Sequence, residues 1–167
     1  MGNFVFIGDS ILDWFNCNYY FPELDIINHG VAGDIINGVI SRLPQAVNRQ
    51  ETQSILVMIG HNDLCMGADV AQAMSKFEKI CALIKEKNIS NVYISGLLPI
   101  DFVDNTIVMD YNNGLKELSL KYGFTFIPVR DNFMDNNLNI NNELSDGLHL
   151  TEKGYNVLAK VFKNYIV

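Results

Sequence analysis

The sequence has few cysteines and few basic residues, and these shortages exclude several classes of protein. Its three cysteines, Cys17, Cys65 and Cys81, cannot all pair with one another, and none belongs to a C-x-x-C motif. A disulfide scaffold and a zinc finger are therefore not expected, and a reducing compartment is favoured. The 12 Lys and Arg residues stand against 19 Asp and Glu, which gives a formal net charge of -7. This balance argues against binding to nucleic acid or to anionic membranes.

Long apolar runs are also missing. No stretch reaches the length of a membrane span, and no basic segment with an apolar stretch and cleavage site opens the chain. We therefore expect no membrane insertion, no signal peptide and a cytoplasmic location. In contrast, 49% of the 167 residues are hydrophobic and only 19% are charged. A chain of this size and composition can bury a core, so we expect a single folded domain over residues 1–167 and no general disorder.

Short apolar runs alternate with longer segments of helical periodicity. The apolar runs predict buried strands at residues 3–8, 24–28, 54–60, 91–96 and 124–128. The periodic segments predict helices at residues 35–48, 70–88, 107–122 and 152–165. Asp69 and Thr151 are expected as N-caps and Gly123 as a C-cap. Strands interleaved with helices form β-α-β units, so we predict an α/β fold, a three-layer α/β/α sandwich around a five-stranded parallel sheet.

One segment, residues 131–145, is too polar for a core element. It is rich in asparagine, with Asn132, Asn136, Asn137, Asn139, Asn141 and Asn142. We expect a long surface loop, and loops of this length in compact domains are often functional. Local disorder of this segment is the alternative.

Small and polar residues follow the predicted strands. The first strand ends in Gly8-Asp9-Ser10, the second leads into residues 29–34 and the third into Gly60-His61-Asn62-Asp63, while Asp146-Gly147-Leu148-His149 precedes the last helix. Ligands of open parallel sheets bind beyond the carboxyl ends of the strands, where these segments are expected to converge. This convergence is the main functional signal in the chain.

These residues suit acyl transfer. The hydroxyl of Ser10 needs a base within reach, and a neutral His149 can take its proton and return it to a leaving alcohol. Asp146 is close enough in a tight turn to hold the histidine in the required tautomer. The amides of Ser10 and Gly33 and the side-chain amide of Asn62 are candidate donors to an oxyanion.

The four segments resemble the conserved blocks of the SGNH (GDSL-type) hydrolases, in that family's order and spacing, over residues 4–154. The resemblance implies a flavodoxin-like sandwich, esterase or lipase-type activity, no metal and no other cofactor. It implies that Ser10 is the nucleophile, His149 the base and Asp146 its orienting acid, and that Ser10, Gly33 and Asn62 form the oxyanion hole. His61 fills the variable position of the third block, where we expect it to bind substrate; hydrogen bonding across the strand ends is the alternative.

Several of these residues have a structural interpretation when taken singly. Ser10 can cap a helix that starts at the next residue, and Asp34 is expected to be an N-cap. Asp9 and Asp63 are expected to bond loop amides. His29 is expected to be structural or to line the rim of the site.

The aromatic residues after the nucleophile form a cluster of Trp14, Phe15, Tyr19, Tyr20 and Phe21. Core packing is their expected role, and the alternative is a rim that holds an acyl chain or a sugar ring. Cys65 is expected to be inert.

The expected activity is that of a serine ester hydrolase acting through an acyl-enzyme on small-molecule esters. The short chain indicates an open cleft and favours acetyl groups on a sugar or other small alcohol. Longer acyl chains, as in a lysophospholipase or thioesterase, are the alternative. Two other classes remain: a flavodoxin-like binding domain without catalysis, and a metal-dependent phosphoesterase, whose ligands would be Asp9, His61, Asp63, Asp146 and His149.

Overall fold

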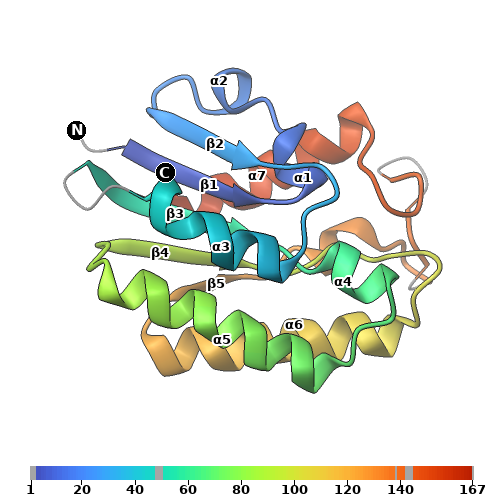
Figure 1. Cartoon of the computed structure of the whole chain (residues 1–167). Coiled ribbons are helices and arrows are strands. Elements are labelled where there is room, and N and C mark those ends of the chain that lie inside the picture. Colours follow the sequence, from blue (N-terminus) through green and yellow to red (C-terminus); the bar gives the residue numbers. More distant parts are fainter. Residues whose placement is uncertain (1–2, 48–50, 138, 142–144, 167) are drawn as a thin grey trace.

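The computed structural model describes residues 3–47, 51–137, 139–141 and 145–166, and places one parallel sheet at their centre. The strands are β1 (Asn3–Gly8), β2 (Ile26–Gly30), β3 (Thr52–Met58), β4 (Asn91–Ser95) and β5 (Thr125–Ile127). They lie in the order β2-β1-β3-β4-β5, and every neighbouring pair is parallel. Helices cover both faces of this sheet (Figure 1), so the predicted three-layer α/β/α sandwich with flavodoxin-like strand order is confirmed.

The long helices lie where the hydrophobic periodicity predicts them. They are α3 (Ile36–Ala46), α5 (Val70–Glu86), α6 (Asn105–Tyr122) and α7 (Glu152–Ile166). Asp69 caps α5 by accepting a hydrogen bond from the Gln72 amide, and Gly123 ends α6 with a left-handed φ of 72°. Thr151 Oγ1 accepts from the amide of Gly154 at 3.1 Å, so the three expected caps are confirmed.

The connections contain short helical turns that periodicity does not predict. They are α1 (Ser10–Asp13), α2 (Cys17–Tyr20), α4 (His61–Cys65) and the 3-10 turn η1 (Arg130–Phe133). A single turn of four or five residues is too short to show a periodic apolar stripe. Two of these turns, α1 and α4, follow the carboxyl ends of β1 and β3 directly.

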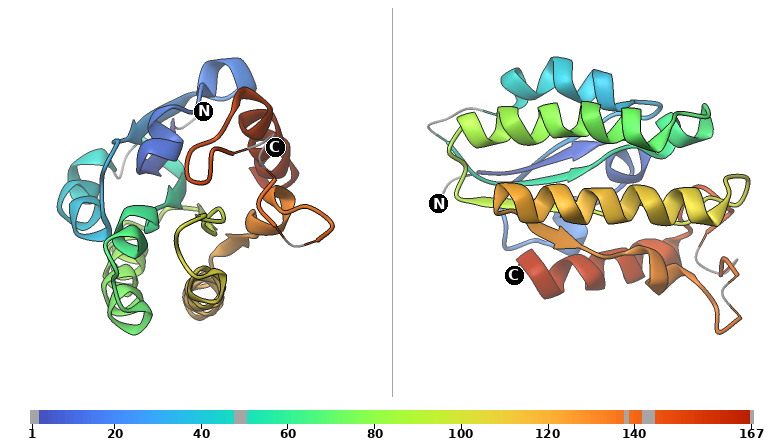
Figure 2. Two further views of the ribbon diagram at one scale, coloured as in Figure 1. Left: turned by 90° about the vertical axis from the view of Figure 1, so that its right-hand side faces the viewer. Right: turned by 90° about the horizontal axis from the view of Figure 1, so that it is seen from below.

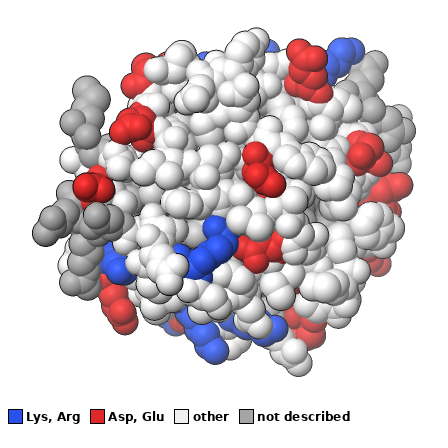
Figure 3. Space-filling model, turned by 45° about the horizontal axis from the view of Figure 1, so that its top comes forward, with Lys and Arg blue, Asp and Glu red and all other residues white. Residues whose placement is uncertain are grey.

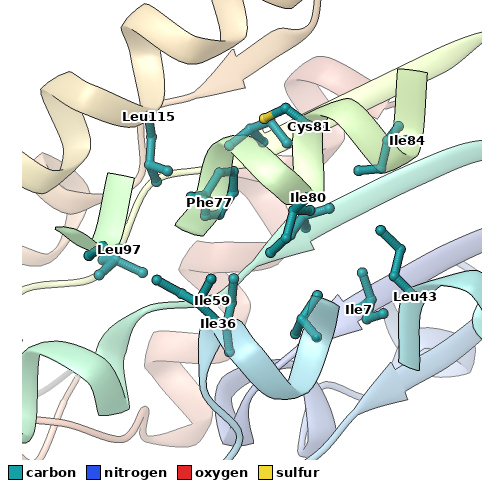
Figure 4. Close-up of a cluster of buried hydrophobic side chains, with 14 of the residues drawn as sticks. Ile7, Ile36, Leu43, Ile59, Phe77, Ile80, Cys81, Ile84, Leu97 and Leu115 are labelled. Carbon is teal, nitrogen blue, oxygen red and sulfur yellow. The ribbon is translucent and has the colours of Figure 1, made fainter. Parts of the chain in front are cut away.

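Each face of the sheet has its own hydrophobic core. Along β1, Val5 and Ile7 face the core shared with α3, α5 and α6 (Figure 4), whereas Phe4 and Phe6 belong to the core on the other face. The second core is packed by residues of α1, α2 and α7. Because both faces are covered, the central strands are apolar at successive positions, as is typical of parallel sheets.

Strand β2 covers residues 26–30 and not the predicted 24–28, because its position is set by pairing with β1. Phe4 pairs with Ile26 and Gly8 with Gly30, which moves the strand two residues towards its carboxyl end. The chain of α1 passes so close to this end that a Cβ at Gly30 would lie 2.1 Å from the Asp13 nitrogen. Glycine therefore continues the strand here where a larger residue could not.

The asparagine-rich segment is partly built into the fold. Phe133 of η1 is fully buried, and Met134 and Ile140 form an isolated antiparallel bridge. Asp135 Oδ1 accepts from the amides of Asn137 and Asn139, both at 2.8 Å. The expected surface loop is confirmed for the exposed residues Asn136, Asn137 and Asn139, whereas Phe133 belongs to the core. Positions 138 and 142–144, Asn142 included, lie outside the described residues.

Charged side chains are dispersed on the face that Figure 3 shows. Acidic groups are spread over this face, and its basic groups lie mainly in the lower part with acidic groups among them. Within the part of the chain that the structure describes, no helix combines the length and the apolar character needed to cross a bilayer.

Candidate active site

The candidate site lies where the connections of the sheet change direction. The chain leaves β1 towards β2 on one side, and β3 leads to β4 and β5 on the other. This arrangement leaves an opening at the carboxyl ends of β1 and β3. Viewed from that edge (Figure 2, left), α1, α4 and the segment before α7 all face the reader. Three of the four segments expected to converge are therefore seen at this edge, and the fourth, the turn after β2, is connected to them through Asn62.

Ser10 is the first residue of α1, directly after β1. Asp9 is the N-cap of this turn, and its Oδ1 accepts from the amide of Ile11 at 3.1 Å. The alternative in which Ser10 caps a helix is therefore wrong, because Asp9 already fills that role. The structural role expected of Asp9 is confirmed.

Gly33 lies in the turn after β2 and has a positive φ of 81°. No described atom would lie within 4 Å of a Cβ at this position, so the backbone is open to a ligand. The side chain of Arg42 stabilises this turn through three contacts. Its Nε lies 2.7 Å from Asp34 Oδ2. Its Nη1 donates to the carbonyl of His29 at 2.6 Å, and its Nη2 donates to the carbonyl of Gly8 at 2.9 Å. One guanidinium thus joins the ends of β1 and β2 to the turn that carries Gly33.

The expectation that Asp34 is the N-cap of α3 is wrong. The cap position belongs to Ile35, and the carboxylate of Asp34 pairs with Arg42 instead. The first amide of the helix, that of Ile36, donates to Asp63 Oδ2 at 3.0 Å. The structural role expected of Asp63 is thereby confirmed. Burial raises the pKa of the Asp63 carboxyl above its ordinary value.

Asn62 joins the turn after β3 to the turn after β2. Its Nδ2 donates to the carbonyl of Asp34 at 2.8 Å. An amide NH2 group carries two hydrogens, so the same group can also donate to a ligand. The side chain of Asn62 therefore lies beside the backbone that follows Gly33.

Asp146 and His149 form a tight turn before α7. Asp146 Oδ1 accepts from the amides of Leu148 at 3.0 Å and His149 at 2.7 Å. Its Oδ2 lies 3.9 Å from Nδ1 of the His149 ring. These two backbone hydrogen bonds hold the pKa of Asp146 below its ordinary value. The carboxylate is thus kept charged beside the imidazole.

Two contacts join this turn and α7 to α1. The rings of Trp14 and His149 have their centroids 4.6 Å apart, and the hydroxyl of Tyr155 donates to the carbonyl of Ile11 at 3.1 Å. Ser10 and His149, both described, are not hydrogen-bonded to each other. Such bonds are often long in free enzymes and shorten when substrate binds. The structure therefore brings the predicted residues to one edge of the sheet, without a hydrogen bond between Ser10 and His149.

We expected His61 to bind substrate, but its ring is buried and both of its nitrogens face protein groups. Its side chain is only 2% exposed, its Nδ1 lies 2.8 Å from Asp9 Oδ2, and its Nε2 accepts from the amide of Leu98 at 3.1 Å. Both ring nitrogens are thus occupied by protein groups. The geometry matches the alternative of hydrogen bonding across the strand ends.

The aromatic cluster divides into two groups. Phe15 and Phe21 are buried, as core packing predicts, whereas Trp14 is 53% and Tyr19 is 70% exposed. The half-buried thiol of Cys65 has its pKa raised by burial, in keeping with the inert role expected of it. Among the residues that the structure describes, no three His, Cys, Asp or Glu side chains are grouped as a metal site requires.

Sequence reasoning missed a cavity beside the Asp146–His149 turn. The cavity measures about 660 Å³ and is lined by Asp101, Phe102 and Asn105 from the β4–α6 connection, and by Met134 and Ile140. The amide of Asp101 donates to the carbonyl of Gly147 at 2.8 Å, which joins the cavity wall to the turn. In the sequence, the apolar pair Phe102-Val103 between Asp101 and Asp104 is the signal that could have indicated this cavity.

Several solved structures of other proteins share this fold. A protein from Streptococcus pneumonia with the provisional name platelet activating factor has 26% identity and a TM-score of 0.91, and the match covers 99% of this chain and 84% of that one. A GDSL-like lipase from Bacteroides thetaiotaomicron VPI-5482 has 17% identity, a TM-score of 0.86 and coverage of 98% and 86%. Axe2, an acetylxylan esterase from Geobacillus stearothermophilus, has 17% identity, a TM-score of 0.79 and coverage of 98% and 93%.

Sequence comparison adds a curated relative and a family. The N-acylneuraminate cytidylyltransferase of Streptococcus agalactiae serotype III (strain NEM316) is 26% identical over 142 residues, which are 83% of this chain and 34% of the relative. The chain thus spans about a third of the length of that relative. The model of the GDSL-like Lipase/Acylhydrolase family matches residues 6–157. Since this match covers most of the sequence, the chain belongs to the GDSL-like lipase/acylhydrolase family of ester-hydrolysing enzymes.

Proposed function

We propose that the protein is a serine hydrolase that removes short acyl groups, above all acetyl, from a sugar or other small alcohol. The observation that carries this proposal is the meeting of four turns at one sheet edge. They bear Ser10, Gly33, Asn62 and His149, and contacts such as the bond from Asn62 to the Asp34 carbonyl join them. None of these turns alone indicates a hydrolase, but together they supply a nucleophile, a base and oxyanion donors.

In the acylation step, Oγ of Ser10 attacks the carbonyl carbon of the ester while Nε2 of His149 takes the hydroxyl proton. The electron pair of the carbonyl moves to its oxygen, towards which the amides of Ser10 and Gly33 and the Asn62 side chain donate. Asp146 stabilises the resulting imidazolium. Collapse of this intermediate breaks the ester bond, and His149 returns the proton to the leaving alcohol.

In the second step, a water molecule attacks the acyl group on Ser10, and His149 takes a proton from that water. The same donors stabilise the second oxyanion. Its collapse releases the carboxylic acid and restores the hydroxyl of Ser10. Each residue therefore serves twice, and the protein needs no further reactant than water.

The cavity beside the Asp146–His149 turn supports a sugar as the alcohol. A volume of about 660 Å³ is in the range of small-molecule sites. Phe102 on its wall is 66% exposed and offers a ring face. Asn105 beside it is held by Arg130, whose Nε and Nη2 donate to Asn105 Oδ1 at 3.1 and 2.6 Å. An apolar ring face next to a fixed amide suits a sugar, which has both C–H faces and hydroxyls.

The names of two relatives also favour a carbohydrate. Axe2 is an acetylxylan esterase, and the curated relative is named for N-acylneuraminate, a sugar acid. We include a cytoplasmic location in the proposal because Cys17, Cys65 and Cys81 are all free thiols. The exposed rings of Trp14 and Tyr19 favour, as second candidate, an ester with a longer acyl chain.

The test compares wild-type protein and Ser10→Ala on p-nitrophenyl esters from two to sixteen carbons and on acetylated xylooligosaccharides and O-acetylated N-acylneuraminate. We expect the highest kcat/KM on acetyl esters. We also expect a loss of several orders of magnitude in Ser10→Ala, with an unchanged circular dichroism spectrum, and no effect of EDTA. Near-wild-type activity of Ser10→Ala, or loss of activity with EDTA, would contradict the proposal. A maximum at long chains would favour the second candidate.

A further inference from the structure

Two Asp–His pairs lie at the carboxyl edge of the sheet, and their distances differ. Nδ1 of His61 is 2.8 Å from the Asp9 carboxylate, whereas Nδ1 of His149 is 3.9 Å from that of Asp146. By this distance alone, His61 would be the better-oriented base. The surroundings of its second nitrogen give it a different role.

The hydrogen bonds of His61 define its protonation. Nε2 accepts from the amide of Leu98, so its lone pair points at that N–H and the ring proton is carried by Nδ1. Nδ1 therefore donates to Asp9, whose side chain is fully buried. A ring buried in this way, with both nitrogens engaged, is not free to take a proton from Ser10.

The His61–Asp9 bond connects the turn that carries Ser10 to the turn that carries Asn62. The proposed mechanism requires these two turns to keep a fixed relative position. Asp9 uses its other oxygen, Oδ1, to accept from the amide of Ile11, and Ser10 lies between these two residues. His61 in turn directly precedes Asn62, the proposed side-chain donor to the oxyanion. The bond to Leu98 adds the chain that follows β4. One imidazole thus connects the carboxyl ends of β1, β3 and β4.

We propose that His61 is a positioning residue, which in its Nδ1–H form holds Asp9 and so fixes the amide of Ser10 relative to the side chain of Asn62. This inference rests on the proposed function. An oxyanion hole works only when its donors are preorganised, and a misplacement of about 1 Å can cost roughly 100-fold in rate. Loss of the bond to Asp9 should therefore lower kcat and leave KM nearly unchanged.

Two substitutions separate this role from a general contribution to stability. In His61→Asn, the side-chain NH2 lies near the former Nδ1 and can donate to Asp9, but it cannot reach Leu98. In His61→Gln, the longer side chain can accept from the Leu98 amide with its oxygen, but the donor to Asp9 is lost. Each variant loses one buried hydrogen bond, so both should be destabilised to a similar degree.

The experiment measures kcat, KM and Tm of the full chain on p-nitrophenyl acetate. We expect His61→Gln to lose roughly 10- to 100-fold in kcat with little change in KM, and His61→Asn to stay within roughly threefold of wild type, at similar Tm. Equal kcat in the two variants, or a change confined to KM, would overturn the positioning role. Ser10→Ala, measured alongside, tests the proposed function separately, because retained activity there would overturn the serine mechanism itself.

A measurement on the wild-type protein covers the case in which neither variant folds. The two-bond ¹H–¹⁵N NMR spectrum of its histidines at neutral pH distinguishes the tautomers. We expect His61 in the Nδ1–H form. An Nε2–H signal for His61 would overturn the inference, because Nδ1 could then not donate to Asp9.

Discussion

The indole ring of Trp14 lies against the imidazole of His149, with centroids 4.6 Å apart and planes inclined by 42°. Trp14 follows α1 directly and remains half exposed, while Phe15 beside it is buried. An exposed aromatic ring in this place can both hold the orientation of His149 and contact the alcohol part of a substrate.

Trp14→Ala should therefore lower kcat/KM for acetylated xylooligosaccharides by roughly 3- to 10-fold, as loss of one aromatic contact predicts. Tyr19→Ala is the matched control, because Tyr19 is an exposed ring of the same segment whose ring contact is with Tyr20. Steady-state kinetics of both variants provide the measurement. Equal losses in the two would show that the contact with His149 has no special role.

Asn62→Ala should reduce kcat by about 10²–10³ with little change in KM, because its side chain is proposed to donate mainly in the transition state. The variant also loses the bond from Asn62 to the Asp34 carbonyl, which should cost about 1 kcal/mol of stability. Kinetics and urea unfolding separate the two effects. A rise in KM at constant kcat would instead place Asn62 in ground-state binding.

We expect the carboxyl of Asp146 to make a pH-dependent contribution to the stability of the fold. Backbone hydrogen bonds from His149 and Leu148 lower its pKa below the ordinary value of 3.8. A carboxyl with a depressed folded-state pKa stabilises the fold above 3.8, and this contribution disappears as the pH falls through the folded-state value. Asp146→Asn retains an oxygen acceptor for both amides and has no carboxyl to titrate.

The free energy of unfolding of wild type relative to Asp146→Asn should therefore be larger at neutral pH than well below pH 3.8. Denaturant titrations at several pH values measure this difference. At neutral pH the same variant should lose about 10²–10⁴ in kcat, because the imidazolium loses its counter-charge. A stability difference independent of pH would contradict the lowered pKa.

Gly60 is required by both its backbone and its surroundings. It has a φ of 128°, and a Cβ there would lie 2.2 Å from the hydroxyl oxygen of Tyr111, which donates to the Ile59 carbonyl at 2.8 Å. Gly67 has a φ of 78° with no described atom within 4 Å of such a Cβ. Gly67→Ala should cost about 1–2 kcal/mol from backbone strain alone. Gly60→Ala should cost about 2 kcal/mol more because of the overlap. Urea unfolding compares them, and equal costs would contradict the close packing.

Local patterns in the sequence predict much of this fold. The helix α5 follows from its apolar stripe and the cap at Asp69, and both depend on residues within a few positions of one another. The first and last residues of β2 depend instead on pairing with β1 and on the passage of α1 over Gly30. No local pattern contains that information.

The same distinction explains the site. The Asp146–His149 turn is predictable because its partners are three residues apart. Asp34 precedes α3 and is expected from the sequence to cap it. The amide of Ile36, the first of the helix, donates instead to Asp63, which lies 27 residues after Ile36. The partner of His61 is Asp9 at a separation of 52 residues, and its other partner is a backbone amide, which no side-chain pattern reveals.

Covalent labelling tests most directly whether Ser10 is the nucleophile. The protein is treated with a serine-directed phosphonate, the intact mass is measured, and the modified peptide is sequenced by mass spectrometry. We expect a single adduct on Ser10 that grows in parallel with the loss of esterase activity, and no adduct in Ser10→Ala. An adduct on another residue, or inhibition of the wild type without labelling of Ser10, would contradict this role of Ser10.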